Sequence, residues 1–568
     1  RPREPLDEDG VDHVATNWHI HKLATPVDAY RNAITGPNVL LAGASPLWLD
    51  GASALPYGFQ HAPKILTVIA TAGGGMVNGT YSYVACYTWV DSRGVTHRSL
   101  PSPPMTGTTS GANNSLTVRV ATCGVSAKLH GGLFIAPDIV AIELYRSEVG
   151  PGMLHYKLID PLPNDVGSSN VSFVDTMPDA NLTVYDTAPL TAQAALYTET
   201  GELGNVPPPA LSTVTTHRGR IVGIDATRRT LWFSKNQTED PEVAPGFNEA
   251  LTLAFADDKI ALTSLDDKLV VLGESSVDVV YGDGPDATGN NNTWQVQPVQ
   301  TDVGCINPRS AVAMPAGCMF QSARGIELLG RDLVVTWVGA VVEDTIAMYP
   351  TITSAVVVPS EQEVRFTCTS ADGTGIVLAW DYAHQFWFTR KYRDESSTGV
   401  DDVAFVDAAL IKNVYTMLTA GGQVYQETSA HKLDGGAAFV SRDIVLAPIS
   451  PSDKMAWHRV KDVSLLGTSV TDHDLEVSIA RDYADDYEQV KLFRAQTDAT
   501  EIGPLEKCRV TLANQKCRAV KLRIRELPPT AGDDVLPFGT GDGMILEGLA
   551  LRVAMKIGPA KTNATERG

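Results

Sequence analysis

Cysteine is scarce in this sequence, and so are long apolar runs. The seven cysteines are odd in number and include no Cys-x-x-Cys pair, which argues against a disulfide framework and indicates buried thiols in a reduced compartment. Cys508 and Cys517 would pair only if they lay on adjacent strands. No stretch of 18 apolar residues occurs, so no transmembrane helix is predicted. Residues 1–5 (RPREP) also lack the apolar core of a signal peptide.

Positive charge is in short supply as well. The chain has 45 Lys and Arg against 66 Asp and Glu, which gives a formal net charge of −21. Phosphate binding needs clustered Lys and Arg, so this balance argues against an outer surface that grips nucleic acid. It fits a soluble surface, or a channel wall that does not retain DNA.

Catalytic and metal-binding motifs are missing. The sequence contains no HExxH, GxSxG or Walker-type GxxxxGK[ST] pattern. His19 and His21 share one face of an expected strand, but no third ligand is near, so we interpret them as structural. The turns at 282–286 and 541–543 carry carboxylates without EF-hand spacing, and Asp-Gly turns are common for backbone reasons alone. We therefore predict no enzyme, no catalytic, cofactor-binding or metal-binding residue, and no cofactor.

Two groups of residues leave a sugar-related alternative open. Paired acids would suit glycoside hydrolysis, although solvated loop charge is the preferred interpretation. These pairs are Asp257-Asp258, Asp266-Asp267, Asp401-Asp402 and Asp485-Asp486. A set of aromatic residues would suit a sugar-stacking platform, although aromatic residues at strand positions more often form the core of a blade. This set is Trp232, Phe233, Trp380, Phe386, Trp387 and Phe388.

Strand patterns, by contrast, are abundant. The 34 Pro and 48 Gly separate short runs rich in Val, Ile, Leu, Tyr and Trp, in which apolar and polar residues alternate, as at 115–120 and 475–479. Such runs are typical of half-buried strands separated by turns. The sequence therefore predicts an all-β fold.

A weak repeat occupies the centre of the chain. Each unit has an apolar strand, a turn and a second strand that is often aromatic. The markers Arg220, Lys268, Gly317, Glu363 and Lys412 are spaced by 48, 49, 46 and 49 residues. A period of about 40–50 residues is typical of β-propeller blades, which cover each other's faces by stacking around an axis. The alternative is a chance spacing of strands in a generic β protein.

The repeat and its flanks predict five segments. Residues 1–30 are expected to form an extended N-terminal arm. Residues 31–62 supply a first propeller segment, with strands at 38–42 and 46–49, and 191–440 supply the other blades. Residues 63–190 are expected to form an inserted immunoglobulin- or fibronectin-like β-sandwich, although the Cys…Trp…Cys pattern of antibody domains is missing. Residues 441–568 are expected to form a C-terminal β-sandwich or platform.

Several short phrases resemble the tail nozzle, or tail tubular B-type, proteins of short-tailed phages (podoviruses). They are 267–285 (DKLVVLGESSVDVVYGDGP), 304–310 (GCINPRS) and 320–326 (FQSARGI). The phrases GTYSY at 79–83 and FVDT at 173–176 resemble the ends of the immunoglobulin-like insert of similar tail proteins, and 457–467 also resembles their C-terminal part. The likeness runs over about residues 70–568.

This resemblance implies a virion structural protein. It would form a homo-oligomeric ring, usually a hexamer, with heterologous interfaces. The ring would dock on an adaptor or gatekeeper ring, carry tail fibres or a tip protein, and pass double-stranded DNA during ejection without binding it specifically. It implies assembly in the host cytoplasm, a place in the virion tail and no membrane partner. Six copies would carry 6 × −21 = −126 charges, so we expect an acidic axial lining that repels phosphate.

Two other functions remain open. One is a glycan-binding or glycan-cleaving propeller, such as a receptor-binding protein or a sialidase-like enzyme. It would need an axial pocket with converging Arg and carboxylate groups, which the sequence does not reveal. The other is a secreted multidomain β adhesin, which the missing signal peptide disfavours.

Overall fold

The computed structural model is almost entirely β. Its described residues fall into two compact units, Arg1–Cys368 with Leu378–Phe388 and Thr369–Val377 with Thr389–Gly568. The residues described are 32–35, 38–43, 46–50, 54–124, 140–150, 155–183, 194–237, 243–392, 403–427, 433–434, 438–451, 457–469, 473–493, 508–528 and 543–554. The expected N-terminal arm, which includes His19 and His21, the Asp401-Asp402 pair and residues 541–542 lie outside them. Among the described residues, no helix has the length and apolarity that a membrane crossing requires.

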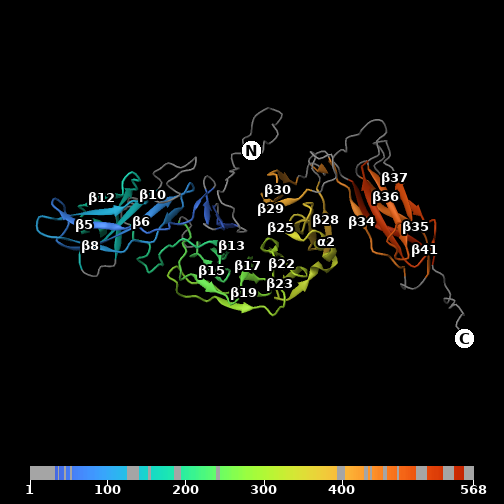
Figure 1. The fold of residues 1–568 in the computed structure, drawn as a ribbon, viewed down its shortest axis with the longest axis horizontal. Helices are drawn as coiled ribbons and strands as arrows, with labels where there is room; N and C mark the ends of the chain where they lie inside the picture. The colour runs from blue at the N-terminus through green and yellow to red at the C-terminus, as the bar shows by residue number, and fades with distance from the viewer. Residues whose placement is uncertain are drawn as a thin grey trace, which may run out of the picture. The chain divides into compact units, whose positions relative to one another are not determined.

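Five sheets share one plan, in which four consecutive strands pair in order as a meander (Figure 1). Their strands are β1 (Asn32–Thr35), β2 (Asn38–Leu41), β3 (Leu47–Leu49) and β4 (Ala54–Pro56); β13 (Leu211–His217), β14 (Arg220–Asp225), β15 (Thr230–Phe233) and β16 (Thr252–Ala254); β17 (Lys259–Leu265), β18 (Lys268–Gly273), β19 (Val277–Tyr281) and β20 (Gln295–Pro298); β21 (Val312–Met314), β22 (Gly317–Ser322), β23 (Gly325–Gly330) and β24 (Val335–Trp337); β25 (Thr351–Val358), β26 (Glu363–Thr369), β27 (Gly375–Asp381) and β28 (Phe386–Arg390). The first strands contact one another in series, from β1 and β13 to β17, β21 and β25. Meanders stacked by their first strands are the blades of a β-propeller, which confirms the predicted propeller core.

The sequence period follows the second strand of each blade. Arg220, Lys268, Gly317 and Glu363 are the first residues of β14, β18, β22 and β26, and Lys412 lies two residues before β30 (Val414–Thr419). Strand β30 belongs to a three-stranded sheet of the second unit, between β29 (Phe405–Ile411) and β31 (Val424–Gln426).

The second strands β14, β18, β22 and β26 are buried at nearly every position because both of their faces are covered. In β18, Leu269 and Val271 pack with residues of β14 and β15. The alternate residues Val270 and Leu272 pack with residues of β22 and β23. Side chains of a strand point alternately to its two faces. Both faces of β18 lie in a hydrophobic core, so its successive residues are all apolar and form a continuous apolar run in the sequence.

Two-residue turns fix the register of the hairpin β13–β14 in a blade and of the hairpin β29–β30 in the second unit. Arg218 and Gly219 have φ of 47° and 73°, and Lys412 and Asn413 have φ of 50° and 65°. Positive φ at both central residues is the geometry of a type I′ turn, whose twist matches that of the paired strands.

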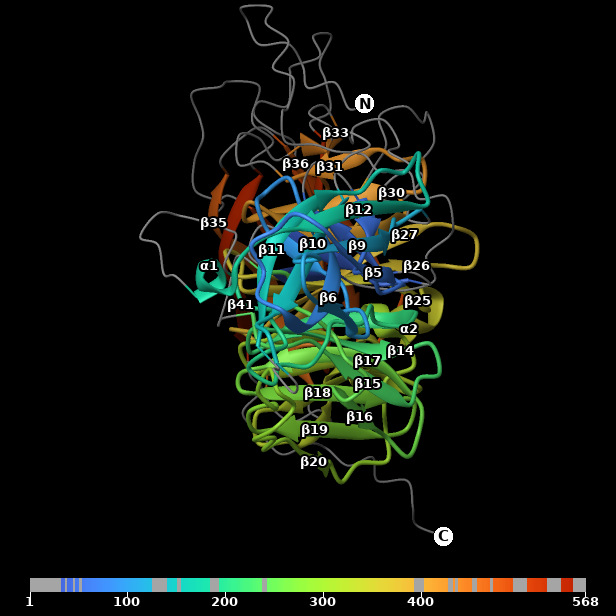
Figure 2. The ribbon, with the colours of Figure 1, turned by 90° about the vertical axis from the view of Figure 1, so that its left-hand side faces the viewer.

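An inserted β-sandwich lies between β4 and β13 in the chain (Figure 2). One sheet has the order β11-β10-β6-β7, with β8 also on β6, and the other has the order β12-β9-β5. The strands are β5 (Ile65–Thr71), β6 (Gly79–Val90), β7 (Thr96–Arg98), β8 (Met105–Thr109), β9 (Ser115–Ala121), β10 (Val140–Ser147), β11 (Tyr156–Pro163) and β12 (Asn170–Asp175). In chain order, β5, β6, β7, β9, β10 and β11 pair as strands B, C, C′, E, F and G of an immunoglobulin-type sandwich do, and β12 takes the place of D beside E. The expected insertion of a two-sheet β-sandwich is confirmed, whereas its likeness to an immunoglobulin domain remains a prediction, and none of its eight described strands corresponds to strand A.

The second unit also contains a sandwich near the C-terminus. Its sheets have the order β34-β40-β36-β37 and, around β35, β38 and β39 on one side with β41 on the other. Its strands are β34 (Asp443–Val445), β35 (His458–Ser469), β36 (Asp474–Arg481), β37 (Gln489–Phe493), β38 (Arg509–Thr511), β39 (Lys516–Cys517), β40 (Val520–Leu527) and β41 (Met544–Ala554). A short pair, β32 (Leu433–Asp434) and β33 (Ala438–Phe439), precedes it. All seven cysteines of the protein are free thiols, and Cys508 and Cys517 form no disulfide.

Helical segments are few and short among the described residues. They are α1 (Asp179–Thr183), η2 (Pro308–Ser310), η3 (Val338–Val342) and α2 (Glu343–Met348). The last two form the connection between β24 and β25, so they link the outer strand of one blade to the first strand of the next.

Candidate functional site

The first strands of the blades are the natural place to look for an axial site. Strands β13, β17, β21 and β25 contain no Asp, Glu or Arg. Their half-buried side chains are uncharged: Ser212, Thr215, Thr216, Ser264 and Thr353 carry hydroxyl groups, and Val312, Ala313, Ala355, Val356 and Val357 are apolar. His217 contacts Ser264 through its Nδ1 at 2.8 Å, and burial lowers the pKa of His217 to about 4, which leaves the ring neutral near pH 7. These strands therefore offer neutral hydroxyl groups and no converging Arg and carboxylate groups.

The one cation of these strands, Lys259, is fully buried in a charge cluster. Its Nζ lies 2.7 Å from Asp257 Oδ1 and 2.5 Å from Asp278 Oδ2, and it donates to Ser276 Oγ at 2.8 Å. These contacts satisfy the three hydrogens of the ammonium group and compensate its burial. The cluster joins the start of β17 to β19 of the same blade, so we interpret it as a structural fastener.

The inserted sandwich is joined to the first sheet of the propeller through Asp91. Trp48 Nε1 on β3 donates to Asp91 Oδ2 at 2.9 Å, and the backbone amides of Arg93 and Val95 donate to Oδ1, both at 2.9 Å. His97 Nε2 lies 3.4 Å from Asp91 Oδ2. Burial alone would raise the pKa of this carboxyl, but the hydrogen bonds outweigh it and hold the pKa of Asp91 at about 2.

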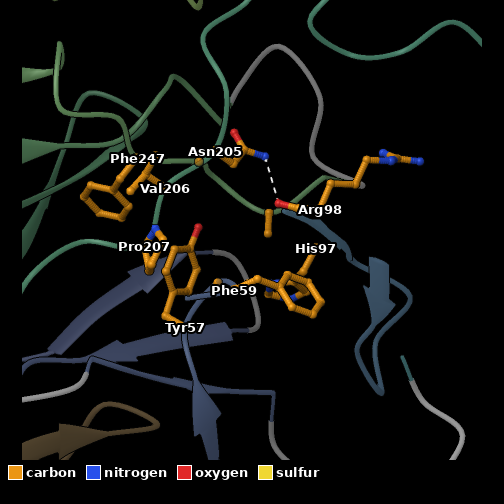
Figure 3. A pocket seen from close by; sticks show the side chains of 11 residues that line it. Tyr57, Phe59, His97, Arg98, Asn205, Val206, Pro207 and Phe247 are labelled. Carbon is orange, nitrogen blue, oxygen red and sulfur yellow. Dashed lines mark hydrogen bonds between the residues drawn. The ribbon is translucent and has the colours of Figure 1, made fainter. Parts of the chain in front are cut away.

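A second set of bonds joins the sandwich to the next blade. Tyr197 donates its hydroxyl hydrogen to Ser99 O at 2.8 Å and accepts from the Asn205 backbone amide at 2.9 Å. The Asn205 side chain donates to Arg98 O at 3.3 Å (Figure 3) and accepts from Lys235 Nζ at 2.9 Å. Together with the Asp91 bonds, they hold the sandwich to two consecutive sheets of the propeller.

A small cavity lies within this joint. It is lined by side chains that include Tyr57, Phe59, His97, Asn205, Pro207 and Phe247 (Figure 3). Its volume of about 10 Å³ is close to that of a single water site. The cavity is therefore too small for a sugar or a cofactor.

Comparisons with known proteins do not assign a family. No family model matches the sequence, and no curated protein matches it. Among solved structures, Hsv2 of Kluyveromyces lactis is similar at 11% identity and a TM-score of 0.27, over 63% of this chain and 94% of that one. Hsv2 of Kluyvelomyces marxianus gives 10% identity and 0.26 over 55% and 72%. A puromycin hydrolase mutant complexed with PGG gives 11% and 0.24 over 75% and 62%.

Most members of the predicted acidic pairs bind cations at turns and loops. Asp257 and Asp258 bind Lys259 and Arg229, the latter at 2.8 Å. The next pair and Asp485 behave in the same way: Asp266 lies 3.1 Å from Arg331, Asp267 lies 2.9 Å from Lys268, and Asp485 lies 3.2 Å from Lys521. These contacts agree with the interpretation as loop charge.

The carboxylate-bearing turn at 282–286 is occupied by its own hydrogen bonds. Asp283 forms an ion pair with Arg218 at 2.7 Å, across from the neighbouring blade. Asp286 accepts from Thr288, Asn290 and Asn291 of its own loop. Within the described part of the chain, no group of three or more His, Cys, Asp or Glu side chains is arranged to hold a metal ion.

The six aromatic residues divide between core and surface. Phe233 is buried against Trp294, with ring centroids 4.4 Å apart, and Trp380 lies 5.0 Å from Trp387. Phe386, however, is 48% exposed, so the expectation of blade core is wrong at this position. It lies on an edge strand, of which the blade interior covers one face only.

Charge is distributed unevenly along the chain. Residues 191–440 have 16 Lys and Arg against 31 Asp and Glu, a balance of −15, which is most of the total of −21. Residues 441–568 have 18 against 19, a balance of −1. Most of the acidic excess of the protein thus lies in residues 191–440, which include four of the five blades.

The joint and the Lys259 cluster escaped the sequence analysis. Trp48 and Asp91 are 43 residues apart, and neither belongs to a motif. The sequence shows the acid pair Asp257-Asp258, but only the fold reveals that the next residue, Lys259, is fully buried. A signal for either site would have required knowing which strands pair.

Proposed function

We propose that this chain is a structural subunit of a short-tailed phage tail, in a nozzle ring that conducts DNA. In this role the ring docks on an adaptor or gatekeeper ring and carries tail fibres or a tip protein. The proposal rests on the resemblance of short sequence phrases to the nozzle family, together with the way those phrases meet in the fold.

The observation that carries the proposal is the contact between two of these phrases. Residues 267–285 form the β18-β19 hairpin, and 304–310 lead into the next blade. Cys305 N donates to Gly273 O at 2.8 Å. A Cβ at Gly304 would lie 2.2 Å from the same oxygen, so only glycine fits there.

The third phrase joins the same contact region. The Ile306 amide donates to Gln321 O at 2.9 Å, and Asn307 Nδ2 donates to Gln321 Oε1 at 3.2 Å and to Ile352 O at 2.8 Å. Three phrases separated in sequence therefore build one inter-blade joint. Phrases that contact one another support a shared architecture better than three phrases scattered over the fold would.

The charge distribution supports the conduit role. A ring whose wall is drawn from the blades, with a balance of −15 per copy, repels phosphate along the DNA path. It has few cations to hold the backbone by counterion release. DNA then passes without stopping, and we expect the acidic axial lining to come from the blades.

Imaging of the purified full-length chain tests the proposal. We expect negative-stain or cryogenic electron microscopy to show closed rings with a central hole, alone or together with the adaptor ring. Fluorescence anisotropy with a labelled 20-base-pair duplex at 150 mM salt should show no binding at micromolar protein. A chain that stays monomeric with and without virion partners, or a basic ring channel that retains DNA, would overturn the proposal. A monomer that cleaves polysaccharide would favour the glycan-cleaving alternative.

A further inference from the structure

The outer strand of one blade carries aromatic rings on both of its faces. Strand β28 is the edge strand of its sheet. On one face, Trp387 packs on Trp380 and on Phe366, with ring centroids 5.0 and 6.1 Å apart. Its Nε1 donates to Val338 O at 2.9 Å, which fixes the indole against η3. This face is part of the blade core.

The opposite face of β28 carries a row of rings, which we call the aromatic row: His384 and Phe386, which are exposed, and Phe388, which is half-buried. The two phenylalanines alternate with Trp387, so they point away from it. Their centroids lie 5.6 Å apart, and the His384 ring lies 6.2 Å from Phe386. Phe386 is 48% exposed, and the His384 side chain is 72% exposed. The blade core thus leaves one side of this row to solvent.

The turn before the strand holds the row in place. Asp381 Oδ1 accepts from the backbone amides of Ala383 and His384 at 2.9 and 2.8 Å, and its Oδ2 lies 2.9 Å from His384 Nδ1. Gln385 completes the turn with φ of 58°. A ring that is already ordered loses little conformational entropy when a ligand stacks on it.

We infer that the aromatic row binds the apolar face of a neutral saccharide chain. Pyranose rings present C–H faces that pack on aromatic rings, and consecutive sugars present such faces in a row. An aromatic side chain offers about 150–250 Å², so three partly exposed rings offer at most about 300 Å². A stable protein interface needs about 800 Å² on each partner. The row has the size of a short oligosaccharide site and not of a protein interface.

Charge selects against anionic ligands at this place. Single-stranded nucleic acids also stack on aromatic rows, but they require a cationic groove along the backbone. Residues 191–440 carry a balance of −15, and Asp381 lies directly beside the row. Arg390 follows Phe388 on the same face of β28, but it is paired with Glu427 at 3.3 Å and therefore adds no net positive charge. Acidic polysaccharides are disfavoured for the same reason. The inference concerns a surface of a single blade and does not depend on ring formation.

Titration calorimetry on the full-length chain tests the inference. The probes are maltohexaose, cellohexaose and chitohexaose as neutral chains, and an oligogalacturonate of similar length as an anionic one. We expect at least one neutral probe to bind with a millimolar or tighter dissociation constant and the anionic probe to bind at least tenfold more weakly. Phe386→Ala should weaken the neutral probe about tenfold or more, and Phe386→Tyr should retain most of the affinity.

Control variants separate stacking from loss of fold. Val341→Ala removes an apolar side chain that is 87% exposed on η3, outside the row, and should leave binding unchanged. Phe388→Ala provides a second lesion in the row, and circular dichroism of every variant should match that of the wild type. The inference is overturned if no neutral probe binds at 10 mM, if Phe386→Ala binds as the wild type does, or if only the anionic probe or an extended peptide binds.

Discussion

The propeller and the C-terminal sandwich are both made of strands, but they are connected in opposite ways. Each blade pairs strands that follow one another in the sequence, as β13 to β16 do. In the C-terminal sandwich, β34 pairs with β40, and β35 pairs with β41. Local pairing leaves a regular period in the sequence, whereas distant pairing leaves only isolated strand patterns. The propeller could therefore be recognised from its spacing, and the pairing within the C-terminal sandwich could not.

The two regions also differ in the use of charge. The blades hold a large excess of acid and bury some charges in clusters, whereas the C-terminal region is nearly neutral. There, Arg525 lies between Asp443 and Glu476 in the strand register, and Arg523 donates to Asp443 at 2.9 Å. In the C-terminal region, positive and negative side chains thus neutralise one another within the sheet. In the blades, the excess negative charge has no partner of opposite sign within the region. Four changes would break or sharpen this comparison.

The largest effect is expected from a cavity in a blade core. Phe320 on β22 is fully buried, and Phe320→Ala should lower the free energy of unfolding by about 4 kcal/mol. Because the protein has two compact units, calorimetry should show the loss in one transition only. Leu522→Ala, in the core of the C-terminal sandwich, should lower the midpoint temperature of the other transition. Equal shifts of both transitions in both variants would mean that the two regions unfold as one.

The next effect concerns the buried charge of the blades. Asp278→Ala removes one of the two carboxylates that compensate the fully buried Lys259, and it should cost about 3 kcal/mol in urea unfolding. Asp258→Ala breaks an exposed pair with Arg229, which solvent screens, and should leave the urea midpoint nearly unchanged. Similar costs for the two variants would show that the cluster does not stabilise the blade.

A tight backbone contact between blades gives the third effect. Gly304→Ala places a methyl group 2.2 Å from Gly273 O and should cost about 2 kcal/mol, because the backbone must move. Gly124→Ala in the sandwich is the matched control, since its Cβ would meet nothing within 4 Å. A harmless Gly304→Ala would mean that the inter-blade joint is loosely packed.

The smallest effect is a dependence on pH at the joint between sandwich and propeller. The folded-state pKa of Asp91, about 2, lies below its ordinary value of 3.8, so the ionised carboxylate stabilises the fold above about pH 4. This contribution, about 1–2 kcal/mol, is lost as the pH falls from 4 towards 2. Urea unfolding of the wild type and of Asp91→Asn should therefore differ at pH 7 and converge near pH 2. A constant difference would exclude Asp91 as the titrating group.

The way in which the strands are covered and paired decides which of them could be predicted from the sequence. The markers from Arg220 to Glu363 identified second strands because those strands are covered on both faces and are apolar at most positions. The outer strands β16, β20 and β24 went unnoticed because they are short and largely polar or exposed. For the same reason, the exposed face of β28 was assigned to the core: sequence alternation does not tell which face of an edge strand remains uncovered.

The inserted sandwich was recognisable, but its attachment was not. The alternation in β6 predicted a strand, and the structure shows that both of its faces are covered. The bonds that fix the sandwich to the blades join residues far apart in the chain, such as Asn205 and Arg98, 107 residues apart. Single polar residues of this kind carry no pattern until their neighbours in space are known.

The chain leaves the first sheet and returns to the next blade at one point. A Cβ on Gly58 would lie 3.2 Å from Pro207 Cβ, so the two ends of the excursion between them touch. The intervening module begins and ends at one place, so another domain could be grafted between these two residues without stretching the chain. Its core is continuous with that of the first two sheets, so a replacement would also have to cover buried blade residues such as Trp48 and Phe247.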